Sequence, residues 1–301
     1  MKTNLSKVAW SLLAVTVVSL SLGKYFDSQC DIGCLFAEGK SIASKNGDDF
    51  NFTLSDDDYI GNNKEPRISG PLAVKLPMVA ALQKLSYRGV STEVKIRKGP
   101  ALAVRAYDYN TDKKWKISES GNELRLDFQR KGPDRLEIDL PPDFKGALAL
   151  STVSGNLDIG EGLELLDLRI QSTSGDVSYQ SHPAGDLSVN TVSGDISSSK
   201  VGTVSPKTVD IKSVSGDSQI ELSAGFQRFK ANTVSGDVKV SVTGKDAAYE
   251  YRMHSISGEF TGIPGAVVKE GIANRETDGK VGEPKGARLE FESISGDFQL
   301  N

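Results

Sequence analysis

Serine, glycine and an acid recur side by side in this sequence, and they are the residues best suited to chemistry. Seven copies of a Ser-Gly-acid motif, the first with Asn156 in place of the acid, lie between residues 152 and 298, among them "TVSGDI", "STSGDV" and "SISGDF". A serine activated by a histidine and an acid could act as a nucleophile. Alternatively, a column of carboxylates could hold divalent cations such as Ca²⁺.

The nucleophile hypothesis lacks a suitable histidine. The two histidines, His182 and His254, lie at different copies, several repeats apart. Every serine–acid pair is also repeated, whereas an active site is needed once. The aromatic residues that could stack on a sugar are Tyr107, Tyr109 and Trp115, and we expect these to cover one end of the fold. The sequence therefore predicts a non-enzymatic protein with no catalytic residue and no cofactor.

The acids that follow the glycines suit a cation ladder less well than a structural role. Carboxylates stacked about 5 Å apart repel one another by about 1 kcal/mol even in water, and Ca²⁺ would relieve that repulsion. One carboxylate per repeat is a small ligand set, however, and short Asx side chains readily accept hydrogen bonds from nearby backbone N–H groups. A structural role is the favoured explanation and a cation ladder is the alternative. The candidate ladder comprises Asp176, Asp195, Asp217, Asp237 and Asp297, and Asn156 and Glu259 complete the column.

A glycine stands at the centre of every copy. Glycine in all seven copies is what a turn position with positive φ would require. We therefore expect these glycines to be structural turn residues. They are Gly155, Gly175, Gly194, Gly216, Gly236, Gly258 and Gly296.

The spacing of these glycines predicts the fold. Successive glycines are 19 to 22 residues apart, except for the last interval of 38, which is close to two periods. Each copy places an alternating apolar run before the motif and a shorter one after it, and no helical pattern lies between. A period near 20 residues is typical of a stacked array. The sequence predicts an all-β, single-stranded β-solenoid with coils of about 20 residues, and an antiparallel sandwich or barrel is the alternative.

The chain before the repeats divides into three segments. Residues 1–23 contain the apolar run Val8–Gly23 after two lysines, and are predicted to be a signal peptide or an uncleaved anchor. Residues 24–84 are predicted to be a polar linker or a loosely ordered lead-in. Residues 85–146 alternate as strands and are predicted to form an N-terminal cap for the solenoid of residues 147–301. The only helix-like stretch is "LPMVAALQKL" at 76–85.

The C-terminal part raises two further expectations. The degenerate stretch between Gly262 and Ala287 is predicted to be a loop. Because the sequence stops directly after the last motif, we expect the last coil to lack a cap and to associate end to end with another chain.

Charge and cysteine content limit the partners and the compartment. Residues 1–146 carry a net charge of +3 and residues 147–301 a net charge of −7, and the acidic repeats argue against a nucleic-acid partner. Cys30 and Cys34 are the only cysteines and could form a small disulfide in an exported chain. The predicted location is the periplasm or surface of a bacterium. Contact with a membrane would involve only the N-terminal segment.

The serial "TVSGDV" copies, introduced by "LEIDLPPDFKGALALSTVSGNLDI", resemble the bacterial adhesin-like family of β-strand-repeat proteins, a domain of unknown function. The resemblance covers about residues 91–301. It implies a β-solenoid in the bacterial cell envelope, and it implies no catalytic residues.

These observations lead to three functional hypotheses. The first is an exported envelope interaction or adhesin-like module whose partner is an envelope protein or a surface glycan. The second is a periplasmic scaffold or regulatory protein that engages a membrane partner in envelope-stress sensing. The third is a carbohydrate-active β-helix enzyme.

Overall fold

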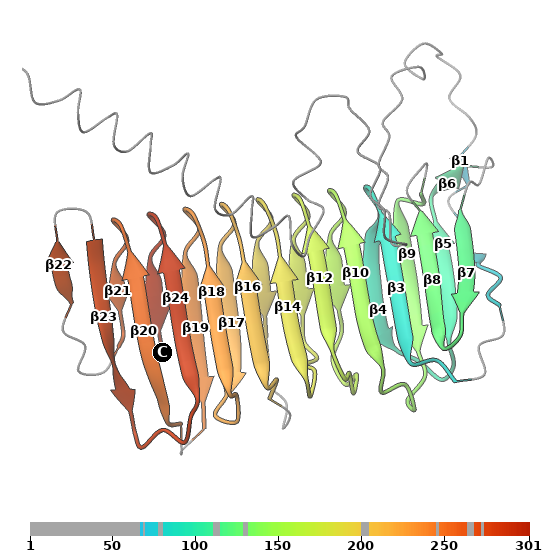
Figure 1. Ribbon diagram of the computed structural model, residues 1–301. Helices are drawn as coiled ribbons and strands as arrows, with labels where there is room; N and C mark the ends of the chain where they lie inside the picture. Colours follow the sequence, from blue (N-terminus) through green and yellow to red (C-terminus); the bar gives the residue numbers. More distant parts are fainter. Residues whose placement is uncertain are drawn as a thin grey trace, which may run out of the picture. The chain divides into compact units, whose positions relative to one another are not determined.

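The computed structural model describes residues 67–68, 70–77, 81–110, 115–128, 132–199, 205–244, 247–263, 268–271 and 274–301 (Figure 1). These residues belong to the unit Glu65–Asn301. The predicted signal peptide, most of the predicted linker, Cys30 and Cys34 lie outside the described residues. Within the described part of the chain, no helix is long and apolar enough to span a membrane.

Two large sheets form this unit. In spatial order the twelve-stranded sheet contains β22 (Lys269–Gly271), β23 (Asn274–Val281), β20 (Tyr249–Ser255), β24 (Arg288–Ser293), β18 (Arg228–Asn232), β16 (Thr208–Lys212), β14 (Asp186–Asn190), β12 (Leu168–Ser172), β10 (Ala147–Thr152), β3 (Lys84–Gly89), β8 (Glu123–Phe128) and β7 (Lys116–Ser120). The eleven-stranded sheet contains β2 (Leu72–Ala73), β5 (Ala103–Tyr107), β9 (Arg135–Leu140), β4 (Glu93–Lys98), β11 (Leu157–Ile159), β13 (Val177–Tyr179), β15 (Ile196–Ser198), β17 (Ser218–Ser223), β19 (Val238–Thr243), β25 (Phe298–Leu300) and β21 (Phe260–Thr261). A separate antiparallel pair consists of β1 (Arg67–Ile68) and β6 (Tyr109–Asn110).

Each repeat contributes one strand to each sheet, and we call such a strand pair a rung. Alternating residues of the repeat strands point inward, so that Leu168 and Ile170 of β12 are buried while Arg169 between them is exposed. Neighbouring rungs pair in parallel and in register, with Ile170 opposite Leu150 and Val189. The apolar core is therefore a set of side-chain columns between the two sheets, which a stack of parallel rungs buries jointly. The predicted β-solenoid is confirmed, and the antiparallel alternative was wrong.

Antiparallel strands lie at both ends of the stack. At the N-terminal end, β5 pairs antiparallel with β9 and β7 pairs antiparallel with β8. The other strands of residues 84–140 continue the same two sheets, because β3 pairs in parallel with β10 and β4 with β11. At the other end β23 pairs antiparallel with β20, so the stretch predicted to be a loop carries strands. The helix-like pattern at residues 76–85 was also misleading about secondary structure. Its last residues, Lys84 and Leu85, begin β3, where pairing with β8 determines the conformation.

The rungs do not follow one another in chain order. Strand β24 lies between β18 and β20, and β25 lies between β19 and β21 (Figure 1). The last motif of the sequence is thus inside the stack, and the rung beyond it is β20–β21, which comes earlier in the chain. The expectation that the last motif forms an uncapped end was wrong, because Asp237 and Glu259 flank it on either side.

Candidate functional site

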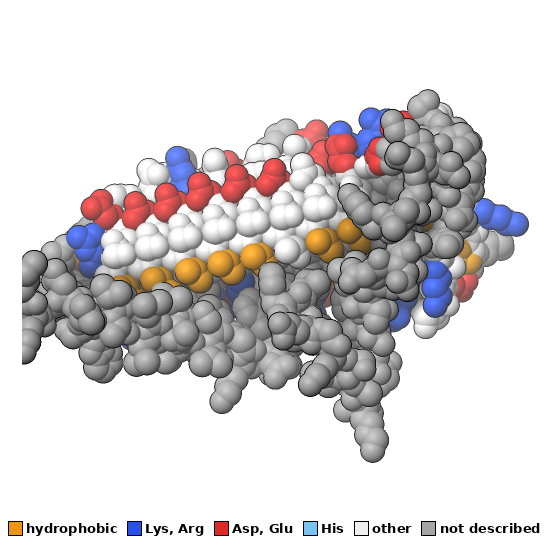
Figure 2. All heavy atoms as spheres, turned by 90° about the horizontal axis from the view of Figure 1, so that it is seen from above, with side chains coloured by type: hydrophobic (Ala, Val, Ile, Leu, Met, Phe, Trp, Pro, Cys, Tyr) orange, Lys and Arg blue, Asp and Glu red, His pale blue; other side chains and the backbone are white. Residues whose placement is uncertain are grey.

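The seven motifs gather along one edge of the stack, which we call the motif edge. Each motif forms the turn from the twelve-stranded sheet to the eleven-stranded sheet, so stacking the rungs aligns equivalent residues. Figure 2 shows the result as a red row of acidic side chains and an orange row of hydrophobic side chains, with white atoms of other residues and of the backbone between them. Since parallel strands lie about 4.8 Å apart, each row repeats at that spacing.

The glycines allow the turns to pack directly on one another. None of the seven motif glycines has positive φ, so the reason predicted for them was wrong. A Cβ atom on Gly216 would lie under 3.0 Å from the carbonyl oxygen of Gly194, and the same holds for each motif glycine and the backbone of the rung beside it. Glycine is required because backbone approaches backbone, and any side chain would separate the rungs.

The acids form what we call the acid row, and each is hydrogen-bonded to the next rung. The backbone N–H of Asp217 donates to Oδ1 of Asp195 at 2.9 Å, and the N–H of Asp237 donates to Oδ1 of Asp217 at 2.9 Å. Asn156 begins this arrangement by accepting from the N–H of Asp176 at 3.0 Å. The order of the row is Asn156, Asp176, Asp195, Asp217, Asp237, Asp297 and Glu259.

The other carboxylate oxygens of the acid row remain accessible. All seven residues are exposed, and within the described residues none of the five aspartates forms an ion pair with a lysine or arginine. Within the described part of the chain, no group of three His, Cys, Asp or Glu side chains is arranged to hold a metal ion. The geometry therefore accounts for the five candidate ladder aspartates as backbone acceptors that present a negative surface.

Two hydroxyl rows support the same turns. The motif serines are exposed, and their hydroxyls donate to carbonyl oxygens of the neighbouring rung, as Ser215 does to Val192 at 3.3 Å. A second, buried row lies three residues before each glycine, and its hydroxyls accept the glycine N–H, as Ser213 does from Gly216 at 3.1 Å. Sequence reasoning missed this buried row, although Ser or Thr fills the position in every copy. Its members are Thr152, Ser172, Thr191, Ser213, Thr233, Ser255 and Ser293.

The histidines do not complete a catalytic group with these serines. His182 lies in the turn between β13 and β14, on the opposite edge of the stack, with its ring 5.4 Å from that of Tyr179. It is 6% exposed and neither ring nitrogen has a hydrogen-bond partner. Burial lowers the pKa of His182, against a smaller opposing effect of Glu221. His254 lies on β20, opposite Glu292 and Glu276 on the neighbouring strands.

The aromatic residues considered for sugar stacking pack at the N-terminal end. The rings of Tyr109 and Trp115 are 5.8 Å apart and meet edge to face, and Trp115 also contacts Phe128. The hydroxyl of Tyr107 donates to Glu137 at 3.1 Å, and the guanidinium of Arg135 lies 4.2 Å from the centre of the Tyr107 ring. These contacts place the aromatic residues in the cover of the stack, as the sequence predicts.

A charged cluster on β4, β5 and β9 is neutralised internally. Arg97 and Arg105 donate to the two carboxylate oxygens of Asp139 at 2.8 and 2.7 Å, and both also contact Glu137. Burial alone would raise the pKa of Asp139, but the hydrogen bonds from Arg97 and Arg105 outweigh it and the pKa is lowered. The cluster ties three strands together and leaves no unpaired acid for chemistry.

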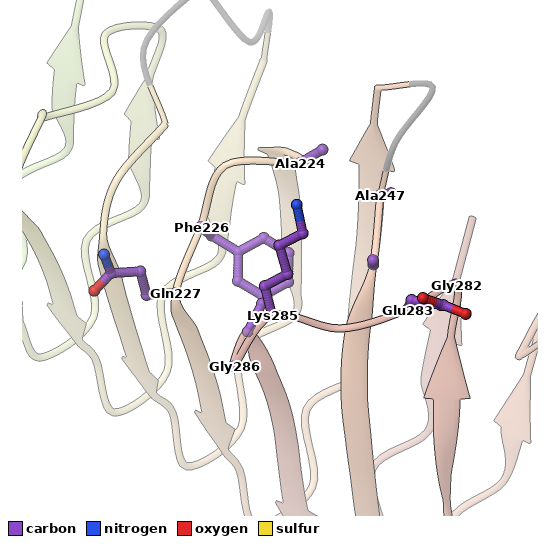
Figure 3. A pocket seen from close by; sticks show the side chains of 10 residues that line it. Ala224, Phe226, Gln227, Ala247, Gly282, Glu283, Lys285 and Gly286 are labelled. Atoms are coloured by element: carbon purple, nitrogen blue, oxygen red, sulfur yellow. The ribbon is translucent and has the colours of Figure 1, made fainter.

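A groove and a hollow lie on the surface of the described residues. A groove of about 490 Å³ runs beside the acid row over several rungs and is lined on its other side by Ser197, Gln219, Lys239 and Gln299. A hollow of about 880 Å³ lies on the opposite edge (Figure 3). Its lining comes from Ala224–Gln227, from Ala247 and Ala248, and from Gly282–Ala287, and is mostly alanine and glycine around Phe226. Neither hollow brings together groups that resemble an active site.

Comparison with known proteins gives one family match. A family model described as Toastrack DUF4097 matches residues 82–301. No curated protein matches the chain.

Two similar solved structures share little sequence with the chain. One, from Clostridium sporogenes, is provisionally described as a cell adhesion protein; it is 12% identical, with a TM-score of 0.35, and the alignment covers 78% of this chain and 99% of that one. The other, from Bacteroides fragilis, is provisionally described as an adhesin; it has the same identity and TM-score, and the alignment covers 78% of this chain and 97% of that one.

Proposed function

Since the chain belongs to the Toastrack DUF4097 family, a family of unknown function, we propose that it is an exported, non-enzymatic interaction module of the bacterial cell envelope. Its partner is an envelope protein or a surface glycan. The motif edge is the binding surface, and the N-terminal segment directs export.

The acid row is the observation that carries this proposal. It holds exposed carboxylates at a fixed spacing on a rigid scaffold, and backbone hydrogen bonds use only one oxygen of each. A partner with basic or hydroxyl groups at similar spacing would make one weak contact per rung. Several such contacts on one rigid surface add up, because after the first contact the others form within the same complex.

The geometry of the motif supports a binding role over hydrolysis. Each motif serine already donates its hydroxyl to a backbone carbonyl, and within the described residues neither histidine is hydrogen-bonded to a motif serine. The repeated row thus suits an extended binding surface better than an active site, since every rung presents the same groups in the same orientation.

The second candidate is a periplasmic scaffold or regulatory protein that engages a membrane partner in envelope-stress sensing. The apolar run Val8–Gly23 favours this candidate if it remains attached as an anchor. Both candidate functions use the same rigid acidic surface, and they differ in the partner that binds to it.

Capture from the envelope tests the proposal. Residues 24–301 would be immobilised and exposed to solubilised envelope of the source organism and, separately, to isolated surface polysaccharide. The control bait has Asp176, Asp195, Asp217, Asp237 and Asp297 all replaced by Asn, which keeps each Oδ1 acceptor. A partner retained only by the unaltered bait supports the proposal: a stoichiometric membrane protein selects the scaffold, and a polysaccharide selects adhesion. Equal retention by both baits, or none by either, would overturn the motif edge as the binding surface.

A further inference from the structure

The interleaved rung β24–β25 is joined to β23 by the exposed connection Gly282–Ala287. We propose that this rung is exchangeable between copies of the chain, so that β24–β25 of one copy fills the slot between β18–β19 and β20–β21 of a second copy. The partner is therefore a second copy of this chain. The inference goes beyond the proposed function. The exchanged rung carries one residue of the acid row, Asp297, but the exchange requires no ligand there.

The slot recognises its rung through contacts that do not involve the connection. Strand β24 pairs in parallel with β18 over Arg228–Asn232 and with β20 over Glu250–Ser255. Strand β25 is held in the same way between β19 and β21. A rung with the same sequence from another copy would make these same bonds.

Charges on the outer face of the twelve-stranded sheet complement this order of strands. Lys230 on β18, Glu290 on β24, Arg252 on β20 and Asp278 on β23 lie directly opposite one another in a single row of alternating sign. Arg228 also contacts Glu290 at 3.3 Å, and Lys230 contacts Glu292 at 3.4 Å. If β20 paired directly with β18 in this register, Lys230 would face Arg252, and like charges directly opposite are destabilising. Direct pairing of β18 with β20, which would close an empty slot, is therefore unfavourable.

The apolar side chains of β24–β25 favour insertion of this rung into a slot. Leu289, Phe291, Phe298 and Leu300 are at most 2% exposed, and the rings of Phe291 and Phe298 are 5.0 Å apart. Leaving the stack exposes all four side chains to water. Removing apolar side chains from water is the main favourable contribution to folding, so reinsertion into any matching slot is strongly favoured over remaining free.

The connection Gly282–Ala287 has the properties of a hinge. Gly282, Glu283, Lys285 and Gly286 are exposed, and the backbone φ angles of Gly282 and Gly286 are 62° and 98°. The connection borders the hollow opposite the motif edge, and the residues across the hollow from it include Ala224, Phe226 and Ala247 (Figure 3). It can extend without displacing a buried side chain, and exchange of an identical element through such a loop is a low-cost route to dimers.

Cross-linking between differently tagged copies tests the exchange. One full-length copy would carry Lys230→Cys and the other Glu290→Cys, with Cys30 and Cys34 replaced by Ser in both. Directly opposite residues in neighbouring strands are close enough for a disulfide. The two copies would be mixed at high concentration, warmed to the start of unfolding, cooled and oxidised. We expect a disulfide-linked heterodimer that carries both tags.

The matched control places the two cysteines on rungs that follow chain order in the middle of the stack. Ser188→Cys in one copy and Asp210→Cys in the other are directly opposite on β14 and β16. We expect at least tenfold less heterodimer from this pair. A single copy with both Lys230→Cys and Glu290→Cys should form the disulfide within the chain and then remain monomeric through the same warming cycle.

Two results would overturn the exchange. One is an intrachain disulfide in the double variant with no heterodimer from the mixed single variants. The other is equal heterodimer from the control pair. No ligand of the acid row is involved, so this experiment can fail while the proposed function stands.

Discussion

At the residue scale, the Ser-Gly-acid motif is a set of backbone contacts between rungs. The sequence revealed the glycine and acid columns but not why glycine is required, because positive φ and close backbone approach select the same residue. The structure separates these causes, since the motif glycines lie against carbonyl oxygens and lack positive φ. The buried Ser and Thr row could have been found from its position three residues before each glycine.

Gly216→Ala should lower the free energy of unfolding by about 1–3 kcal/mol, the usual cost of overpacking. The added Cβ would meet the Gly194 carbonyl oxygen at less than 3.0 Å, and a backbone atom in a packed stack cannot move aside. Gly225→Ala is the matched control, since its Cβ would find only Ser205 at 3.5 Å. Denaturant unfolding of both variants checks this, and an unaltered midpoint for Gly216→Ala would refute the close-approach explanation.

Asp217→Asn should leave stability nearly unaltered, whereas Asp217→Ala should cost about 0.5–1.5 kcal/mol, the net value of one hydrogen bond. Asparagine keeps the Oδ1 that accepts the N–H of Asp237, as Asn156 already does for Asp176. Thermal melts with and without Ca²⁺ would also test the cation ladder. A calcium-dependent rise in Tm that Asp217→Asn abolishes would favour the ladder over the structural role.

His182 should make the protein less stable in mild acid. Burial lowers its pKa in the folded state, so the unfolded chain, with a pKa near 6.5, binds the proton first. Stability is then complete above about pH 6.5 and falls as the pH decreases toward the lower folded pKa. His182→Phe should remove this part of the pH dependence. Unfolding midpoints at pH 7.5 and 5.5 check it, and parallel slopes for both proteins would contradict it.

At the element scale, the strands were predictable and their order was not. Alternation in runs such as "LRIQST" and "VDIKSV" marks strands with one buried face, and the structure has β12 and β16 there. The sequence cannot reveal that β24 precedes β20 in space, because the two strands lead into almost the same motif. The charges that distinguish them, at Lys230, Glu290 and Arg252, become complementary only in the observed register.

Glu290→Lys should destabilise the protein by about 1 kcal/mol, because it turns two favourable cross-strand pairs, each contributing about 0.2–1 kcal/mol, into repulsive ones. The loss should shrink in high salt, which screens exposed charges. Glu283→Lys, in the exposed connection before β24, is the control and should be neutral. Urea unfolding at low and high salt measures both. Equal stability of the two variants at low salt would contradict the role of the charge row.

At the scale of the whole molecule, the 20-residue period led directly to the solenoid. A single rung cannot bury its apolar face, so repeated copies must stack, and stacking turns one residue per copy into a row on the surface. The ends were harder to predict, because they depend on which strand pairs last. Antiparallel β2, β5 and β7 finish one end and β23 and β22 extend the other, while the last motif of the chain lies inside. The acid row follows from this architecture and is the feature that the proposed function uses.

The most direct test of this account is the affinity of the captured envelope partner for the protein with and without its row of charges. The affinity is measured at low and high salt for the unaltered chain and for a variant in which five aspartates are replaced by Asn. The replaced residues are Asp176, Asp195, Asp217, Asp237 and Asp297. Equal melting temperatures of the two proteins establish beforehand that the variant is folded. We expect the variant to bind at least tenfold more weakly at low salt and to lose most of the salt dependence. Equal affinity of the two proteins at both salt concentrations would contradict the motif edge as the binding surface.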